Sequence, residues 1–203
     1  MTDSGIPAEA LPGLKGEKNR IRDEMLKMRL SVSAEEKAAA DAGMTKRLMS
    51  LASFRYADTI LFYYPIKGEP DLTAAVSAAL AMGKRAAFPK CCPDGAGMVY
   101  KFVTSLSELS PAMYGIPEPP EENESYVPSP FLSDICIVPA VCFDRRGYRI
   151  GYGKGYYDRF LAGFGGTSVG FTLDCLLKDS VPRGRYDRSV DMIITEKGAV
   201  VPK

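Results

Sequence analysis

The sequence predicts a three-layer α/β/α single domain with a largely parallel, Rossmann-like sheet. Short apolar runs rich in β-branched and aromatic residues alternate with helical segments over most of the chain, without an internal repeat or an evident linker. The 203 residues are long enough for one substantial core. We therefore expect one domain over residues 15–203, preceded at 1–14 by a loose leader that holds glycines and prolines without periodicity.

Two helices are expected at the beginning of this domain. From Lys15 to Leu30, apolar residues recur at near-helical spacing among basic neighbours, which is typical of an amphipathic helix. Ser33 and Glu36 then form a capping-box pattern, in which the serine bonds first-turn amides and the glutamate reaches back. We expect the second helix to run to about Ser53.

The remaining elements alternate between strand and helix. Strands are expected at 59–64, 84–89, 98–103, 135–143, 167–172 and 191–195, and helices at 72–82 and 156–162. The run 135–143 is the most apolar of the strands. A polar turn is expected at 65–71, and a proline-rich, acidic surface excursion at 117–130.

Composition narrows both the chemistry and the partners. The 26 basic and 25 acidic residues leave a net charge of +1, which gives no support for nucleic-acid binding by bulk charge. No histidine is present, so a histidine base or nucleophile is excluded. The five cysteines form no C-x-x-C pair, and Cys136 and Cys142 are expected to be buried, reduced thiols of a cytoplasmic protein. Neither a membrane segment nor a signal peptide is expected, because no apolar run is long enough.

The run Asp144–Asp158 (DRRGYRIGYGKGYYD) holds the strongest chemical signal. Gly151, Gly153 and Gly155 let the backbone approach an anion closely, and the following helix adds its positive N-terminal end. Because the run follows a buried strand, we expect it at the carboxyl end of that strand, where ligands of α/β domains bind. Five cations occur within fifteen residues: Arg145, Arg146, Arg149, Lys154 and Arg159. Phosphate is the expected ligand, and a flexible glycine-rich surface turn is the alternative.

The spacing of these glycines does not name an enzyme. It matches neither the P-loop pattern nor the dinucleotide pattern G-x-G-x-x-G. Asp158, three residues beyond the last glycine, is a candidate Mg²⁺ ligand, with a first-turn helix acid as the alternative. Asp187 and Asp191 are further metal candidates, and spacing alone does not choose between them.

The run GYRIGYGKGYYDRFL resembles the signature of the 5-formyltetrahydrofolate cyclo-ligase (methenyltetrahydrofolate synthetase) family. Four further segments resemble family segments in order and spacing, over about residues 18–196: KNRIR from Lys18, YYPIKGEPDL with Glu69, YGIPEP from Tyr114, and VPRGRYDRSVDMIITE with Asp187. Tyr186 stands where many bacterial members have histidine, but the aspartate after it is kept.

The resemblance implies an ATP-dependent cyclisation of 5-formyltetrahydrofolate to 5,10-methenyltetrahydrofolate with release of ADP and phosphate. Phosphorylation of the formyl oxygen would give an imidoyl phosphate, which folate N10 attacks, so that no protein nucleophile is needed. The task left to the protein is to align the reactants and to neutralise charge.

The resemblance also implies roles for individual residues. Lys154 and Arg149 would act in catalysis, Asp158 and Asp187 would hold Mg²⁺, and Glu69 would face the pterin. Tyr64, Tyr152 and Tyr156 would pack around the folate, each with a core or sheet position as its alternative. ATP would be bound by Lys18, Arg22, Arg149, Ile150, Gly151, Tyr152, Gly153, Lys154, Gly155, Tyr156 and Tyr157. Spacing alone would make Lys18 and Arg22 part of a solvated helix face.

Two other classes of function remain open from the residues. One is a non-catalytic nucleotide-binding regulator that keeps the loop but lacks the folate pocket. The other is a sugar-phosphate isomerase or acyl-transferase on a similar scaffold. The expected partners are ATP and 5-formyltetrahydrofolate, with or without a polyglutamate tail, and the expected protein is a monomer without nucleic-acid or membrane partners.

Overall fold

The computed structural model describes residues 13–128 and 133–202, so most of the expected leader, at residues 1–12, lies outside the described part. The helices are α1 Leu14–Leu30, α2 Ala34–Ser50, α3 Ala52–Tyr56, α4 Thr73–Ala81 and α5 Tyr156–Leu161. Short 3-10 turns lie at Leu106–Glu108, Met113–Gly115 and Asp174–Leu176. Within the described ranges, no helix is long and apolar enough to cross a membrane.

The second helix begins as predicted and ends early. Ser33 accepts a hydrogen bond from the backbone N–H of Glu36, and the Glu36 carboxylate accepts one from the backbone N–H of Ser33, so the capping box is confirmed. The predicted continuation to about Ser53 is wrong. Leu51 has an extended backbone with ψ of 140°, which separates α2 from α3.

The central sheet has seven strands in the order β12-β11-β9-β6-β1-β2-β3. The strands from β11 to β2 run parallel, and β12 and β3 add antiparallel edges, which confirms a largely parallel sheet. The bounds are β1 Thr59–Leu61, β2 Arg85–Cys91, β3 Met98–Val103, β6 Ile135–Pro139, β9 Thr167–Phe171, β11 Met192–Ile194 and β12 Ala199–Val200.

The apolar run predicted as one strand over 135–143 is two strands in different sheets. β6 lies in the central sheet, whereas β7 (Cys142–Asp144) pairs with β8 (Arg149–Ile150) and β10 (Leu177–Lys178). The chain turns between them at Ala140 and Val141, whose carbonyl groups accept hydrogen bonds from the Arg29 guanidinium. The remaining hairpin, β4 (Ser110–Pro111) with β5 (Pro117–Glu118), consists of strands too short to give a periodic signal.

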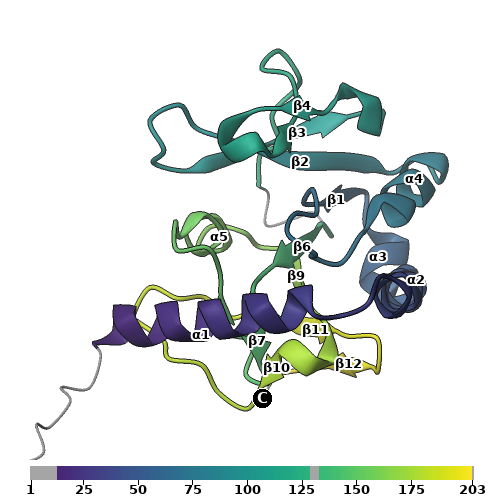
Figure 1. Ribbon diagram of the computed structural model, residues 1–203. Coiled ribbons are helices and arrows are strands. Elements are labelled where there is room, and N and C mark those ends of the chain that lie inside the picture. The colour runs from purple at the N-terminus through teal and green to yellow at the C-terminus, as the bar shows by residue number, and fades with distance from the viewer. Residues whose placement is uncertain (1–12, 129–132, 203) are drawn as a thin grey trace, which may run out of the picture.

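Side chains on the two faces of the central sheet build separate cores. Ile135 and Ile137 face the cluster that includes residues of α1, α2, α3 and α4, whereas Cys136 and Val138 face the cluster covered by α5. The helices α2, α3 and α4 therefore lie on the opposite side of the sheet from α5, which confirms the three layers (Figure 1). The Cys136 and Cys142 thiols are buried and free.

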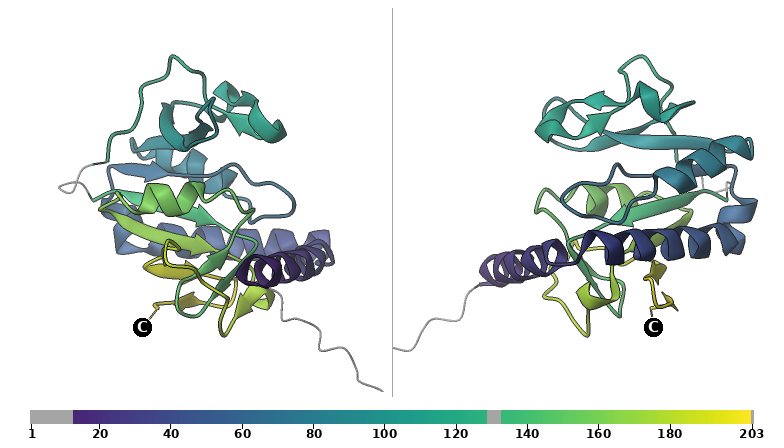
Figure 2. Two further views of the ribbon diagram at one scale, coloured as in Figure 1. Left: turned by 90° about the vertical axis from the view of Figure 1, so that its left-hand side faces the viewer. Right: turned by 45° about the vertical axis from the view of Figure 1, so that its right-hand side comes forward.

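Helix α1 lies across one end of the molecule, and its first turns extend beyond the sheet (Figure 2). It contacts β8 and the 3-10 turn at Asp174–Leu176, so it runs beside the segment that leads into the glycine-rich loop. Residues far apart in the sequence, from both halves of the chain, therefore meet along this helix.

Candidate active site

The glycine-rich loop connects β8 to α5. Gly153 and Gly155 have φ of +92° and +68°, in the left-handed region that favours glycine. Gly155 is the N-cap of α5 and offers no side-chain cap, so the first amides of that helix are not capped by it. The run Asp144–Asp158 is predicted at the carboxyl end of one strand over 135–143; in the structure the β7–β8 hairpin of a second sheet lies between β6 and the glycines.

The five cations predicted to cluster at this loop separate into two groups. Arg145 pairs with Asp179 and Arg146 with Asp144, on the turn of the β7–β8 hairpin. Arg159 supports the loop by donating to the Lys154 carbonyl oxygen at 3.0 Å. Its guanidinium would lie 3.1 Å from a Cβ placed on Gly155. Lys154 is exposed, with its Nζ 5.4 Å from the centre of the Tyr114 ring, so Arg149, Lys154 and Arg159 remain at the loop.

One face of α1, here called the α1 stripe, carries Lys18, Arg22 and Arg29 and faces the loop and its neighbouring segments. Arg22 donates from Nε to the Gly151 carbonyl oxygen at 2.7 Å, and Lys18 pairs with the Asp187 carboxylate. Between and beyond them, Ile21 and Met25 are buried in the core. Lys18 and Arg22 therefore do not belong to a solvated helix face: Arg22 contacts the loop and Lys18 the Asp187 segment, a position that spacing alone did not predict.

Arg149 and Asp158 form an ion pair at the base of the loop. The Arg149 guanidinium is buried and donates to Asp158 Oδ1 at 2.7 Å and to the Arg188 carbonyl oxygen at 2.7 Å. Asp158 Oδ1 also accepts from the Arg188 backbone N–H at 3.1 Å. These bonds connect the loop to the segment that carries Asp187.

The two predicted metal ligands lie on neighbouring segments, each beside a cation. Asp187 Oδ2 accepts from the Gly184 N–H at 2.7 Å besides pairing with Lys18. Within residues 13–128 and 133–202, no three acidic, cysteine or histidine side chains gather at one point. The donor set therefore fits Mg²⁺ only as one or two carboxylates completed by phosphate oxygens and water. The carboxylate of Asp191, the other metal candidate, accepts hydrogen bonds from the Ser168 hydroxyl and N–H on β9.

Glu69 lies in the turn at 65–71 and is buried beside Arg29, at the C-terminal end of the α1 stripe. Only 3% of the residue is exposed, and its Oε2 accepts from the Ile66 N–H at 3.1 Å. Burial raises the pKa of Glu69 from 4.5 to about 7, although the Ile66 N–H and the nearby Arg29 guanidinium favour the charged form. The carboxyl group is thus poised to change its charge near neutral pH.

The predicted tyrosines occupy different environments. Tyr152 lies between Glu69 and Lys67, whose Nζ is 5.2 Å from the ring centre, and burial raises the pKa of Tyr152 to about 12. Tyr156 faces Tyr114, whose hydroxyl raises the pKa of Tyr156 to about 12. Tyr64 packs partly against the larger core. Ile150 and Tyr157 also direct their side chains into the cores, so these two could offer only backbone groups to a ligand.

Three residues near this site carry no role in the sequence prediction: Arg29, Lys67 and Tyr114. Lys67 and Tyr114 have positive φ of 47° and 60°, which residue type does not reveal. Arg29 gives a signal that could have been followed. It lies seven residues after Arg22 and eleven after Lys18, a spacing that keeps all three on one helix face.

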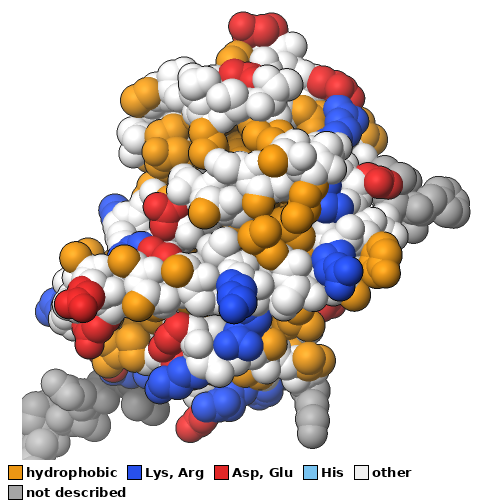
Figure 3. Space-filling view, turned by 90° about the vertical axis from the view of Figure 1, so that its right-hand side faces the viewer, with side chains coloured by type: hydrophobic (Ala, Val, Ile, Leu, Met, Phe, Trp, Pro, Cys, Tyr) orange, Lys and Arg blue, Asp and Glu red, His pale blue; other side chains and the backbone are white. Residues whose placement is uncertain are grey.

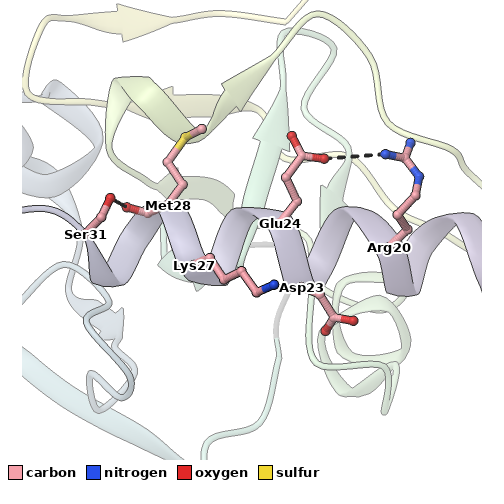
Figure 4. A pocket seen from close by; sticks show the side chains of 6 residues that line it. All are labelled: Arg20, Asp23, Glu24, Lys27, Met28 and Ser31. Atoms are coloured by element: carbon pink, nitrogen blue, oxygen red, sulfur yellow. Dashed lines mark hydrogen bonds and ion pairs between the residues drawn. The ribbon is translucent and has the colours of Figure 1, made fainter.

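Two hollows of the described surface lack this chemistry. One follows the outer face of α1, where the lining side chains are Arg20, Asp23, Glu24, Lys27, Met28 and Ser31 (Figure 4). The other lies beside the β7–β8 turn. On the face that carries α4, hydrophobic, basic and acidic side chains are intermixed (Figure 3). None of these places joins the glycine loop, Asp187 and Glu69.

The chain is similar in sequence and structure to a group of folate enzymes. A model of the 5-formyltetrahydrofolate cyclo-ligase family matches residues 14–196. The 5-formyltetrahydrofolate cyclo-ligase of Haemophilus influenzae is 27% identical over 175 residues, which cover 84% of this chain and 92% of that protein.

Two solved structures resemble this one over most of their length. The 5,10-methenyltetrahydrofolate synthetase of Aquifex aeolicus has a TM-score of 0.77 and 34% identity, over 91% of this chain and 92% of that one. The synthetase of Mycoplasma pneumoniae has a TM-score of 0.71 at 24% identity, over 89% and 99%, and supports the fold alone.

Proposed function

The chain belongs to the 5-formyltetrahydrofolate cyclo-ligase family, and we propose that the glycine loop, the α1 stripe and Glu69 form its active site. The enzyme carries out the ATP-dependent conversion of 5-formyltetrahydrofolate to 5,10-methenyltetrahydrofolate. One observation carries the assignment of the site. A single helix face contacts the Asp187 segment through Lys18, the loop through Arg22 and the Glu69 carboxyl group through Arg29.

The ATP half of the site is the loop with its cations. Backbone amides from Gly151 to Tyr157 would approach the phosphates, and Lys18 and Arg22 would close on them from α1. Lys154 and Arg149 would act in catalysis by neutralising charge on the transferred phosphoryl group. The Lys154 side chain is exposed and could turn from the Tyr114 ring toward a phosphate, whereas the buried Arg149 is held in place by Asp158 and Arg188.

The folate half is the Glu69 turn. A carboxylate there can accept hydrogen bonds from the N–H edge of a pterin, and Tyr64, Tyr152 and Tyr156 would pack around the ring system. Glu69 Oε1 is buried without a hydrogen-bond partner among the described residues, which supports a ligand donor as its partner.

The proposed chemistry needs only alignment and charge neutralisation. The formyl oxygen attacks the γ-phosphorus and ADP leaves, which gives an imidoyl phosphate. Folate N10 then attacks the formyl carbon and releases its proton to solvent, and phosphate leaves with the former formyl oxygen. No protein nucleophile takes part, which agrees with a chain that lacks histidine.

Mg²⁺ is proposed as the metal, held by Asp158 and Asp187 together with ATP. Bound there, it would neutralise phosphate charge. The protein's own contribution is to hold both carboxylates beside the loop through Arg149, Lys18 and the Gly184 N–H.

The test of this function is direct. The protein is incubated with 5-formyltetrahydrofolate and Mg²⁺, with and without ATP, and the methenyl product is followed by its absorbance. We expect product only with ATP. Absence of an ATP-dependent change would contradict the assignment, and ATP binding without turnover would instead favour a nucleotide-binding regulator.

We also propose that the enzyme is a cytoplasmic monomer. The free thiols of Cys136 and Cys142 are typical of proteins in a reducing compartment. A dimer mass in size-exclusion chromatography with light scattering would contradict the monomer.

A further inference from the structure

Arg29 connects three parts of the site from a buried position. It is 3% exposed, near the end of α1. Its Nη2 donates to the Val141 carbonyl oxygen at 2.8 Å and also to that of Ala140. Its Nη1 lies 3.4 Å from the Tyr152 hydroxyl and 3.9 Å from Glu69 Oε1. One guanidinium group therefore contacts the end of β6, the glycine loop and the Glu69 turn.

The contacts of Arg29 are unequal. The two carbonyl groups hold one end of the guanidinium firmly, whereas the distance from Arg29 to Glu69 Oε1 exceeds that of a hydrogen bond. Arg29 Nε and Glu69 Oε1 are both buried without a partner within the described residues. Buried polar atoms rarely stay unpaired, because each costs the free energy of its lost hydration. The arrangement thus orients the carboxyl group and leaves one of its oxygens free.

We propose that Arg29 is a positioning residue for folate, which fixes the Glu69 carboxylate and the Tyr152 hydroxyl in one arrangement while Glu69 Oε1 stays free to accept a donor from the substrate. This inference rests on the proposed placement of folate at Glu69. A purely structural anchor of α1 would need only the two carbonyl contacts. The contacts to Glu69 and Tyr152 distinguish the two roles.

Charge gives the proposal a second, measurable consequence. The groups that face Glu69 are Arg29 from α1, Lys67 from its own turn, Tyr152 from the loop, and Tyr63 and Tyr157 from the core side. Arg29 lowers the pKa of Glu69 against the effect of burial, so loss of the cation raises that pKa further above 7. Because the chain has no histidine, this titration is not masked by an ordinary histidine pKa.

The experiment compares Arg29→Met, Arg29→Lys and the control Arg20→Met, which removes an exposed arginine from the same helix. Affinity for 5-formyltetrahydrofolate without ATP is measured from pH 6 to 9, and affinity for Mg-ATP is measured in parallel. For the wild type and Arg20→Met, we expect folate affinity to rise as pH passes through about 7, since Glu69 then becomes charged. Arg29→Met should move this midpoint upward and weaken folate binding about tenfold or more at pH 7.

Arg29→Lys separates charge from geometry. An ammonium group keeps the charge, so the pH midpoint should stay near that of the wild type. It cannot hold the carbonyl groups while contacting both Glu69 and Tyr152, so affinity should still fall about tenfold. Both Arg29 variants should change Mg-ATP affinity by less than about threefold, because the proposed role of Arg29 is in the folate half of the site.

Two outcomes would overturn the proposal. One is unchanged folate affinity in the Arg29 variants. The other is an equal loss of folate and Mg-ATP affinity at every pH with no shift of the midpoint, which would make Arg29 a structural anchor. If Arg29→Met does not fold, the Arg29→Lys arm still decides between these results. A wild-type protein that fails to bind 5-formyltetrahydrofolate would count against the proposed function instead.

Discussion

The two ends of the α1 stripe carry the same kind of ion pair in different surroundings. Lys18 and Asp187 keep 20% and 21% of their side chains exposed, whereas Arg29 and Glu69 keep 1% and 2%. Water hydrates the charges of Lys18 and Asp187 whether or not the two side chains contact each other. The second pair has lost its hydration, so each partner depends on the other and on nearby polar groups.

This difference suits the two proposed ligands. ATP phosphates arrive charged and must leave as ADP and phosphate, and partly exposed cations can exchange partners at low cost. A pterin is uncharged and must be held in one orientation. The Glu69 carboxyl group, held by Arg29, can orient such a ring because it is buried. The same burial raises the pKa of Glu69.

The comparison is tested most strongly by stability. Arg29→Met should lower the free energy of unfolding by about 3–5 kcal/mol, because it leaves Glu69 buried without its cation. Lys18→Met, at the exposed end of the stripe, should cost about 1 kcal/mol or less. Urea unfolding of both variants at pH 8 measures the two changes. Equal losses would show that burial does not distinguish the two pairs.

The next largest effect is expected at the phosphate half. Lys154→Ala removes a mobile cation from the loop and should lower kcat/KM about a hundredfold, since it removes charge stabilisation from the transferred phosphoryl group. Its unfolding curve should match that of the wild type, because the Lys154 side chain is exposed. ATP titration and steady-state rates are the measurements. Unchanged values of both would exclude Lys154 from the site.

The buried end should also give stability a pH dependence. Burial raises the pKa of Glu69 from 4.5 to about 7, so the folded state favours the neutral acid. The stabilisation of the folded state by this raised pKa is fully present below about pH 4.5 and is lost as pH rises through about 7. The free energy of unfolding of the wild type should therefore fall between pH 5 and 8. In Glu69→Gln, which cannot titrate at this position, the fall should be smaller by about 2 kcal/mol. Parallel stability–pH curves for the two proteins would contradict the buried-acid description.

Sequence patterns anticipated the layers and most elements, because alternating apolar runs report burial directly. They failed where a tertiary contact decided the outcome. The break between β6 and β7 lies at Ala140 and Val141, whose carbonyl groups bind Arg29, a residue more than a hundred positions away. The strands β8 and β10 have two residues each and carry no periodicity.

The candidate site divides in the same way. The glycines and cations of the loop indicated a phosphate from residue types alone. Lys18, Arg22 and Glu69 came only from the family resemblance, because their partners are distant in sequence. The residues alone named Asp187 as a metal candidate but could not choose between it and Asp191. Neither the residue patterns nor the family resemblance predicted a role for Arg29, because a basic residue on an amphipathic helix is ordinarily solvated. Its burial depends on the turn of 65–71 and on the β6 end, which local sequence does not encode.

The smallest predicted effect concerns the metal. Asp158→Asn keeps an oxygen that can accept from the Arg188 N–H but removes the charge that pairs with Arg149. We expect the Mg²⁺ concentration for half-maximal rate to rise about tenfold or more, because the metal would lose one of its two proposed protein carboxylates. Asp179→Asn is a matched control, because its carboxylate is fully exposed and pairs with Arg145 on the distant hairpin turn. A lower maximal rate with an unchanged Mg²⁺ titration would assign Asp158 to holding Arg149, so the metal would then depend on Asp187 and the phosphates.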